Sequence, residues 1–409
     1  MIVIDKSNID ERKIREIYRE SVLEEVRKRI VSHLQVQYQD DANKIVSAFL
    51  QSQFGNNPND ITEDAMEDYL FGGDINAIVL AFWRCVSDIW SRKEQMLKLS
   101  ESSVEKLSRW NGVRERALEE KDVVKRITLI KDVISKATLP FFLGIAESDI
   151  DGLKKRGTVI SNLSKLEKVK LKYSDDLYHE KQGALIILSN IFSYSLLDGE
   201  PRHKLLTAMN ISVCPYCNRQ YITHYQDAGK DKITADLDHF YCKSKYPYLA
   251  LSLYNFVPSC QICNSRFKLA RDFYGTPHLY PYEQNPTSGM RFTIADAHVL
   301  MDEEAWKDMT APVVEIKTTG EAAVNSAQTF HLKDVYQSHG DYVQEIIWKA
   351  KIYSDDKITS LHEEFSAVFA NEEEVRNLVF GQYLEEKEAH KRPLAKLTQD
   401  LLEEFGVLK

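Results

Sequence analysis

Apolar side chains recur at steps of four residues near the start of the chain, at Ile14, Tyr18, Val22, Val26 and Ile30. This spacing places them on one face of a helix, so we predict an amphipathic helix over residues 8–34. The same kind of pattern predicts further helices at 40–54, 74–100, 103–134, 151–173 and 179–197. Turn-rich stretches such as FGNNPND and FGGD separate some of them. Residues 1–200 are therefore predicted to form a mostly helical domain.

The pattern changes near residues 198–204, where helical periodicity stops and Tyr, Cys, Pro and Asn become frequent. Strand-like segments are predicted at 290–301 and 311–319. Helical periodicity returns over 333–369 and 371–405, with Pro393 expected in the first turn of the last helix. The predicted fold class is mainly α, with a small α+β module in the middle of the chain.

The composition is that of a globular protein, because 43% of the 409 residues are hydrophobic and 28% are charged. No apolar run approaches the roughly 18–20 residues of a membrane span. The first residues, MIVIDKSNIDERK, contain acids where a signal peptide needs a basic and then an apolar region. We therefore expect a soluble, cytoplasmic protein whose six cysteines do not form a disulfide scaffold.

Charge is unevenly distributed along the chain. The net charge is −9, but residues 201–277 contain ten basic and five acidic residues, which gives +5 there and −14 elsewhere. A positive patch on an acidic body is what a phosphate-backbone site needs. No GxxxxGK[ST] or GxGxxG motif is present, so the sequence contains no recognisable cradle for nucleotide phosphates.

Two CxxC pairs lie inside this basic segment. They are Cys214 with Cys217 in CPYC, and Cys260 with Cys263 in CQIC, separated by 42 residues. Four thiolates in two such pairs suit a closed, tetrahedral structural zinc site, although redox or incidental pairs are the alternative. Cys85 lies in an apolar stretch and is expected in a core, and Cys242 lacks a paired neighbour, so neither is assigned a ligand role.

Between the two pairs, the run ADLDHFYCKSKYP combines carboxylates with a histidine. Asp236 and Asp238 alternate on one face of a predicted strand and His239 follows directly. Asn255 comes before the second CxxC pair, and Asn264 directly follows Cys263. In this order the segment 210–272 resembles the HNH endonuclease family, which is built on a ββα-metal module. Asn264 stands where many members have His, and an amide binds a divalent ion more weakly.

The resemblance implies a metal-dependent endonuclease that leaves 5′-phosphate and 3′-hydroxyl ends. Neutral His239 can accept a proton from water as the general base. Asp238 and Asn264 offer the hard oxygen ligands that suit one catalytic Mg²⁺ or Mn²⁺. At the position of Asn255, an amide or a backbone carbonyl can hold the imidazole in the correct tautomer. Asp236 is interpreted as an exposed strand residue, with indirect support of the ion as the alternative.

Basic side chains around this constellation are candidates for contacts with the phosphate backbone. They are Arg219, Lys243, Lys245, Arg266 and Lys268, with tyrosines interleaved. A solvated basic surface is the alternative interpretation. His278, in the following TPHLYPYEQNP, is interpreted as a loop anchor. The expected partner is nucleic acid, with double-stranded DNA favoured over RNA.

Three domains are predicted: a helical N-terminal domain (1–200), the HNH module with its zinc site (201–290), and a mixed then helical C-terminal region (291–409) packed on the module. The chain is also similar to HNH nucleases that act as effectors of bacterial anti-phage defence, such as the nuclease subunit of Septu-type systems. That resemblance implies an ATPase or sensor partner, for which residues 1–200 are the expected docking domain. A helical flank of this size can also support a homo-oligomer. A zinc-stabilised binding module without chemistry is the alternative function.

Overall fold

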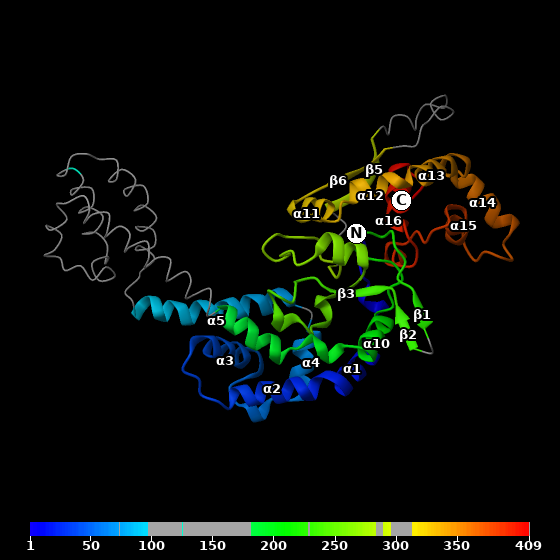
Figure 1. Ribbon diagram of the computed structural model, residues 1–409. Coiled ribbons are helices and arrows are strands. Elements are labelled where there is room, and N and C mark those ends of the chain that lie inside the picture. The colour runs from blue at the N-terminus through cyan, green and yellow to red at the C-terminus, as the bar shows by residue number, and fades with distance from the viewer. Residues whose placement is uncertain are drawn as a thin grey trace. The chain divides into compact units, whose positions relative to one another are not determined.

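The computed structural model describes residues 1–72, 74–96, 125, 181–227, 230–283, 289–295 and 313–408 (Figure 1). The chain forms two compact units. One contains Met1–Arg29, Thr62–Ile75 and Ile191–Lys409, and the other contains Ile30–Ile61 and Asn76–Asn190. This division differs from predicted boundaries at 200 and 290, because two N-terminal segments belong to the unit that contains the predicted HNH module.

The predicted first helix is present, with a wider π-helical turn in its middle. It consists of α1 (Glu11–Tyr18), η2 (Arg19–Leu23) and α2 (Glu24–Leu34). Asp10 caps α1 by accepting a hydrogen bond from the backbone of Lys13, as expected for an acid at this position. The apolar positions used for the prediction, including Ile14, Val22 and Ile30, are all buried.

The other N-terminal elements are η1 (Lys6–Asn8), α3 (Asp41–Phe54), η3 (Pro58–Asp60), α4 (Glu63–Phe71) and α5 (Ile75–Met96). The sequence pattern did not reveal α4, which Thr62 caps through its hydroxyl. Residues 181–191 are helical as predicted, whereas the predicted helices at 103–134 and 151–173 lie outside the described residues apart from residue 125. In the described ranges, no single helix is long and apolar enough to cross a membrane, and one bent pair, Glu63–Phe71 with Ile75–Asp88, passes the same test of length and composition.

Helical structure continues past the predicted change near residues 198–204. Short η5 (Tyr194–Leu197) is followed by α10 (Glu200–Met209), in which Pro201 occupies the first turn. Proline is compatible with that position because the first backbone N–H groups of a helix have no partner inside it. The prediction that helical structure stops here is therefore wrong.

In the described part of the chain, three antiparallel strand pairs follow. They pair β1 (His224–Asp227) with β2 (Lys230–Ile233), β3 (Ala235–His239) with β4 (Phe256–Cys260), and β5 (Met290–Ile294) with β6 (Val314–Thr318). Pro258 is tolerated in β4 because a two-stranded sheet leaves one edge of each strand unpaired. The loop between β3 and β4 contains η6 (Pro247–Leu249) and η7 (Leu253–Asn255).

The β3–β4 hairpin runs directly into a helical segment, residues 261–268, whose larger part is the π-helix η8 (Cys263–Lys268). This segment ends at Leu269, which has a positive φ of 53° and donates its backbone N–H to the carbonyl of Asn264. The order of strand, strand and helix is the one that the sequence resemblance predicts.

The C-terminal region consists of α11 (Glu321–Thr329), α12 (Leu332–Tyr336), η11 (Gln337–His339), α13 (Gly340–Ile352), α14 (Asp355–Glu364), α15 (Glu372–Phe380), η12 (Glu386–Glu388) and α16 (Ala395–Glu404). Pro393 precedes the cap of α16, Leu394, rather than lying in its first turn. The coarse prediction is confirmed, because the described chain is mainly helical with small antiparallel sheets.

Tyrosine hydroxyls attach the N-terminal segments to the β3–β4 loop, which explains the division into units. Tyr18 donates to the Leu251 carbonyl (2.9 Å), and Tyr69 donates to the Tyr248 carbonyl (2.7 Å). Tyr254 in the loop donates to the carboxylate of Glu11 (2.6 Å). Helices α1 and α4 therefore support the loop that joins the two central strands.

Replacing Tyr18 with Phe removes the only atom through which this side chain reaches the Leu251 carbonyl. We expect the free energy of unfolding to fall by about 1–2 kcal/mol, because a buried carbonyl loses its donor. Urea unfolding measures this change. Tyr225→Phe, at a position that is 50% exposed, is the matched control. Equal stability of the wild type and Tyr18→Phe would contradict the docking of α1 on this loop.

Candidate functional site

The four paired cysteines converge at one point. The sulfurs of Cys214, Cys217, Cys260 and Cys263 all lie within 4.8 Å of one another, and all four residues are buried. Burial raises the pKa of Cys214, whereas hydrogen bonds from the neighbouring thiols lower the pKa of Cys217. Four sulfurs in this arrangement could bind a metal ion such as zinc.

Backbone and side-chain hydrogen bonds shape the first CxxC turn. Asn218 has a positive φ of 48°, and its N–H donates to the carbonyl of Cys214 (2.8 Å). Its fully buried side chain donates to the Ala389 carbonyl (2.9 Å) and accepts from the backbone N–H of Lys396 (2.9 Å). Tyr336 donates its hydroxyl to the Cys217 carbonyl (2.7 Å). The C-terminal region therefore packs directly on the cysteine cluster.

His239, at the end of β3, is held by a backbone carbonyl. Its Nε2 lies 3.0 Å from the carbonyl oxygen of Ala250, and because a carbonyl can only accept, Nε2 carries the hydrogen. The rings of Tyr194 and Phe256 pack against the imidazole with centroid distances of 4.8 and 4.9 Å. Burial lowers the pKa of His239 to about 3, so the ring is neutral near pH 7. In the described structure, Nδ1 takes part in no hydrogen bond.

Asp238 forms a buried ion pair. Lys268, from η8, places Nζ 3.1 Å from one carboxylate oxygen and 2.6 Å from the carbonyl of His239. The hydroxyl of Tyr216 donates to the other carboxylate oxygen (2.6 Å). Burial raises the pKa of Asp238, and these two partners oppose that shift. Both oxygens of the predicted metal ligand therefore have partners in this structure.

Asn264 lies next to Asp236 instead of Asp238. Its amide nitrogen donates to Oδ2 of Asp236 (3.0 Å), and the hydroxyl of Ser265 reaches the same oxygen (3.3 Å). Asp236 and Asp238 share one face of β3, and η8 lies along this face with Asn264 at one carboxylate and Lys268 at the other. Asp236, interpreted from the sequence as an exposed strand residue, is half-buried and belongs to the site.

Within the described structure, Asn255 forms no hydrogen bond with the imidazole of His239. Its fully buried amide accepts from the backbone N–H of Tyr241 (2.8 Å) and donates to the carbonyls of Tyr241 and Leu249 (3.1 Å each). The carbonyl that holds His239 belongs to Ala250, the residue after Leu249. Neither group of residue 255 therefore holds the imidazole: the backbone carbonyl of Asn255 accepts from the N–H of Phe240 (2.7 Å), and its side chain fixes the loop that carries the Ala250 carbonyl.

The five predicted phosphate contacts differ in accessibility. Lys243 is exposed, with Nζ 4.4 Å from the centroid of the Tyr194 ring, and Arg266 is also exposed. Lys245 is exposed and paired with Asp272 (3.2 Å), and half-buried Arg219 donates to His339 (2.9 Å). Lys268 is only 1% exposed because it neutralises Asp238, which corrects its assignment as a phosphate contact.

Sequence reasoning missed Tyr194 and the carbonyl of Ala250. Tyr194 comes from η5, outside the segment that carries the resemblance, and no motif marks it. A backbone carbonyl leaves no trace in residue identity. The pairing of Lys268 with Asp238 could have been suspected, because an acid at a strand end and a lysine in the following helix are both part of the resemblance segment.

We expect the purified protein to carry about one zinc per chain, measured by elemental mass spectrometry. Cys217→Ser and Cys263→Ser should lose the metal and lower the Tm, because three thiolates no longer close a tetrahedral shell. Cys85→Ser, outside the cluster, is the control and should keep both metal content and Tm. Protein freed of metal that keeps the wild-type Tm would rule out a structural ion.

His239 should make stability sensitive to acid. Its folded pKa of about 3 lies below its ordinary value of 6.5, so at pH 5 the unfolded state binds a proton that the folded state does not. Between pH 7.5 and pH 5 the wild type should therefore lose about 2 kcal/mol more unfolding free energy than His239→Asn. Urea unfolding at both pH values measures this difference, with His224→Asn, at an exposed position, as the control. Equal losses in the wild type and His239→Asn would show that the imidazole is hydrated.

Comparisons of the chain with protein-family models, with curated proteins and with solved structures found no match. The function is therefore inferred from the site: a hairpin followed by a helix, four converging sulfurs, a neutral imidazole and two carboxylates on one strand face.

Proposed function

We propose that the protein is a metal-dependent endonuclease of the HNH type that hydrolyses phosphodiester bonds, with double-stranded DNA as the preferred substrate. The observation that carries this proposal is the fixed imidazole of His239. Its Nε2–H is bound to the Ala250 carbonyl (3.0 Å), and the ring lies at the end of the first strand of a strand–strand–helix unit.

The tautomer of His239 suits a general base. With the hydrogen on Nε2, the lone pair is on Nδ1, where a water molecule can donate its proton. The carbonyl of Ala250 then stabilises the imidazolium that forms, because it accepts the Nε2–H more strongly when the ring is charged. Asn255, through Leu249 and Tyr241, keeps that carbonyl in place and is therefore a positioning residue.

The proposed catalytic cation is assigned to side chains of the β3 face, because carboxylate and amide oxygens are the ligands that a hard divalent cation such as Mg²⁺ or Mn²⁺ prefers. Asp236 and Asn264 place a carboxylate and an amide side by side on the half-buried part of the β3 face. Asp238 can join them only by exchanging its ammonium partner, Lys268. When bound, the cation would supply charge stabilisation to the oxygens of the scissile phosphate.

Exposed cations are available for the phosphates that flank the scissile bond. Lys243 lies against Tyr194, whose ring contacts His239, so its charge is close to the proposed base. Arg266 is exposed on η8, two residues after Asn264. Such contacts would position the strand without recognising its sequence.

A non-catalytic binding module is the second candidate, and one observation favours it. Lys268 already neutralises Asp238 inside the protein, with side-chain exposures of 1% and 5%. A module that binds nucleic acid or protein without cleaving it does not need the Asp238 carboxylate as a metal ligand. The ion pair with Lys268 would then only stabilise the fold.

The proposed role in bacterial anti-phage defence rests on the sequence resemblance. It implies an effector that works with an ATPase or sensor partner. Because Met1–Arg29 and Thr62–Ile75 belong to the unit with the site, partner docking is assigned to the unit formed by Ile30–Ile61 and Asn76–Asn190.

A plasmid-nicking assay with Mg²⁺ or Mn²⁺ tests the enzyme proposal. We expect His239→Ala to reduce the rate by about 100-fold or more, because the water loses its general base. Asp236→Asn and Asp238→Asn, compared side by side, identify the carboxylate that the cation requires. His224→Ala, at an exposed position, is the control.

The wild type should be tested on duplex DNA, single-stranded DNA and RNA together. If it shows no metal-dependent cleavage of any of them and yet binds them, the binding module is the correct function. Cleavage by His239→Ala at the wild-type rate would show that His239 is not the general base.

A further inference from the structure

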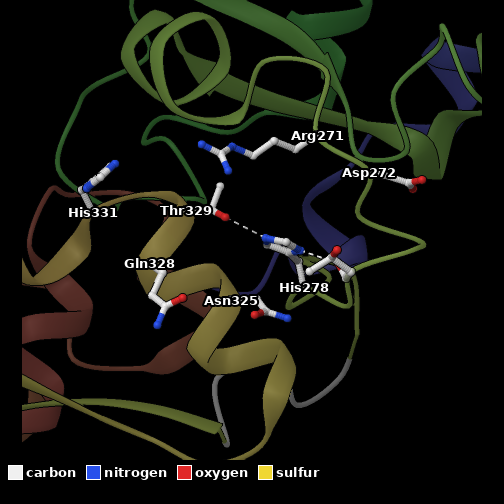
Figure 2. A pocket seen from close by; sticks show the side chains of 8 residues that line it. Arg271, Asp272, His278, Asn325, Gln328, Thr329 and His331 are labelled. Atoms are coloured by element: carbon white, nitrogen blue, oxygen red, sulfur yellow. Dashed lines mark hydrogen bonds between the residues drawn. The ribbon is translucent and has the colours of Figure 1, made fainter. Parts of the chain in front are cut away.

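A polar pocket of about 420 Å³ lies beside the module, between the segment that follows η8 and helix α11. Arg271 and His278 line it from the first side, and Asn325, Gln328 and Thr329 line it from α11, with His331 beyond the end of that helix (Figure 2). Pockets for small ligands commonly measure about 300–1,000 Å³. The size therefore suits a single nucleotide.

His278 forms a fixed wall of the pocket. Its ring stacks on Phe273 with a centroid distance of 3.7 Å and an angle of 13°. Nδ1 lies 2.6 Å from the Thr276 carbonyl and must carry the hydrogen, so Nε2 accepts from the hydroxyl of Thr329 (2.9 Å). Both ring nitrogens are thus engaged, and the prediction that His278 anchors a loop is consistent with these bonds.

Two side chains offer unused hydrogen-bonding groups to the pocket. Arg271 donates Nε to the Phe267 carbonyl (3.1 Å), which fixes the plane of the guanidinium, and within the described residues its two terminal nitrogens have no partner. Figure 2 shows this guanidinium extended over Thr329. The side-chain amide of Gln328, exposed on α11, is likewise without a hydrogen-bond partner in the described part of the chain.

The pocket carries the charge of one free guanidinium. The carboxylate of Asp272, which also lines the pocket, accepts from Tyr246 (2.7 Å) and pairs with Lys245 (3.2 Å). In Figure 2 this carboxylate points away from Arg271. A planar guanidinium with free terminal N–H groups matches the oxygens of a phosphate.

An aromatic side chain, His331, also lines the pocket. The exposed imidazole of His331 lies 5.1 Å from the ring of Phe267, measured between centroids. Flat side chains of this kind stack with the bases of single-stranded or unpaired nucleotides, and amides such as Gln328 can bond to base edges. The pocket thus offers Arg271 to a phosphate, Gln328 to the edge of a base and His331 to the face of a base.

Direct contacts connect the pocket with the proposed catalytic site. The wall residue His278 stacks on Phe273, Lys268 places Nζ 4.9 Å from the centroid of the Phe273 ring, and the same Nζ binds Asp238 (3.1 Å). Only the buried side chains of Phe273 and Lys268 therefore separate His278, in the pocket wall, from Asp238, so the pocket and the proposed catalytic site belong to the same packed region.

We propose that this pocket binds one unpaired nucleotide of the nucleic acid that the site at His239 is proposed to cut, such as a nucleotide beyond the end of a duplex, with its phosphate on Arg271 and its base against Gln328 and His331. The inference rests on the proposed function, since it assigns the pocket to the same substrate. The nucleotide held there would fix the register of the strand relative to the scissile bond.

Binding of a fluorescein-labelled DNA duplex with a single-stranded overhang to the full chain, measured by anisotropy, tests this proposal. His239→Ala serves as the parent so that the probe is not cut. Adding Arg271→Ala should weaken binding about tenfold and lower the slope of log Kd against log salt concentration by about one, because one phosphate contact is lost. Gln328→Ala should weaken binding about threefold without changing that slope.

Arg12→Ala is the matched control, because it removes one arginine whose side chain is 92% exposed on α1. If the parent binds and Arg271→Ala and Gln328→Ala bind equally well, the pocket is not part of the substrate site and the inference fails while the proposed function stands. If the parent binds no nucleic acid, both fail. If a mononucleotide binds in an Arg271-dependent way and oligonucleotide affinity does not change, the pocket is a separate nucleotide site and the inference is overturned.

Discussion

The convergence of four sulfurs is the constraint on which the middle of the chain depends. One CxxC pair precedes the β3–β4 hairpin, and the other joins the end of β4 to η8, so holding all four sulfurs within 4.8 Å fixes the hairpin and the helix to one point. That position brings Asn264 to Asp236 and Lys268 to Asp238. A small two-stranded sheet has little stability of its own, so a bound ion would supply what the sheet lacks.

One face of β3 carries two carboxylates that differ in burial and in the charge of their partners. Asp238 is buried and neutralised by an ammonium group, whereas the carboxylate of half-buried Asp236 is bonded, among the described residues, only to neutral donors, the amide of Asn264 and the hydroxyl of Ser265. An ammonium at this distance compensates a buried charge but also competes with any metal ion for the same oxygens. In the proposed enzyme a metal ion would have to displace Lys268 from Asp238, whereas in the alternative binding module this ion pair would remain.

Support for the module comes from both ends of the chain. Tyr18 and Tyr69 bond to carbonyls of the loop that carries Ala250, while Asn218 of the first CxxC turn accepts from the backbone N–H of Lys396 in the first turn of α16. The proposed base is held by a carbonyl of that loop, so its orientation depends on Tyr18 and Tyr69, which lie 233 and 179 residues before the carbonyls that they bond. Because these contacts join residues far apart in the sequence, the compact unit includes Met1–Arg29 and Thr62–Ile75, which the sequence analysis assigned to a separate N-terminal domain.

The sequence by itself determined the local features. Apolar spacing identified the helix over residues 8–34, strand alternation identified β3, and the paired CxxC spacing identified the cysteine cluster, because each depends on neighbours within a few residues or on a repeated motif. Tertiary structure decided the partners: Lys268 for Asp238, Asp236 for Asn264, and the Ala250 carbonyl for His239. Such choices depend on which side chains meet after packing and on backbone atoms that every residue shares, and neither is encoded in residue type or spacing.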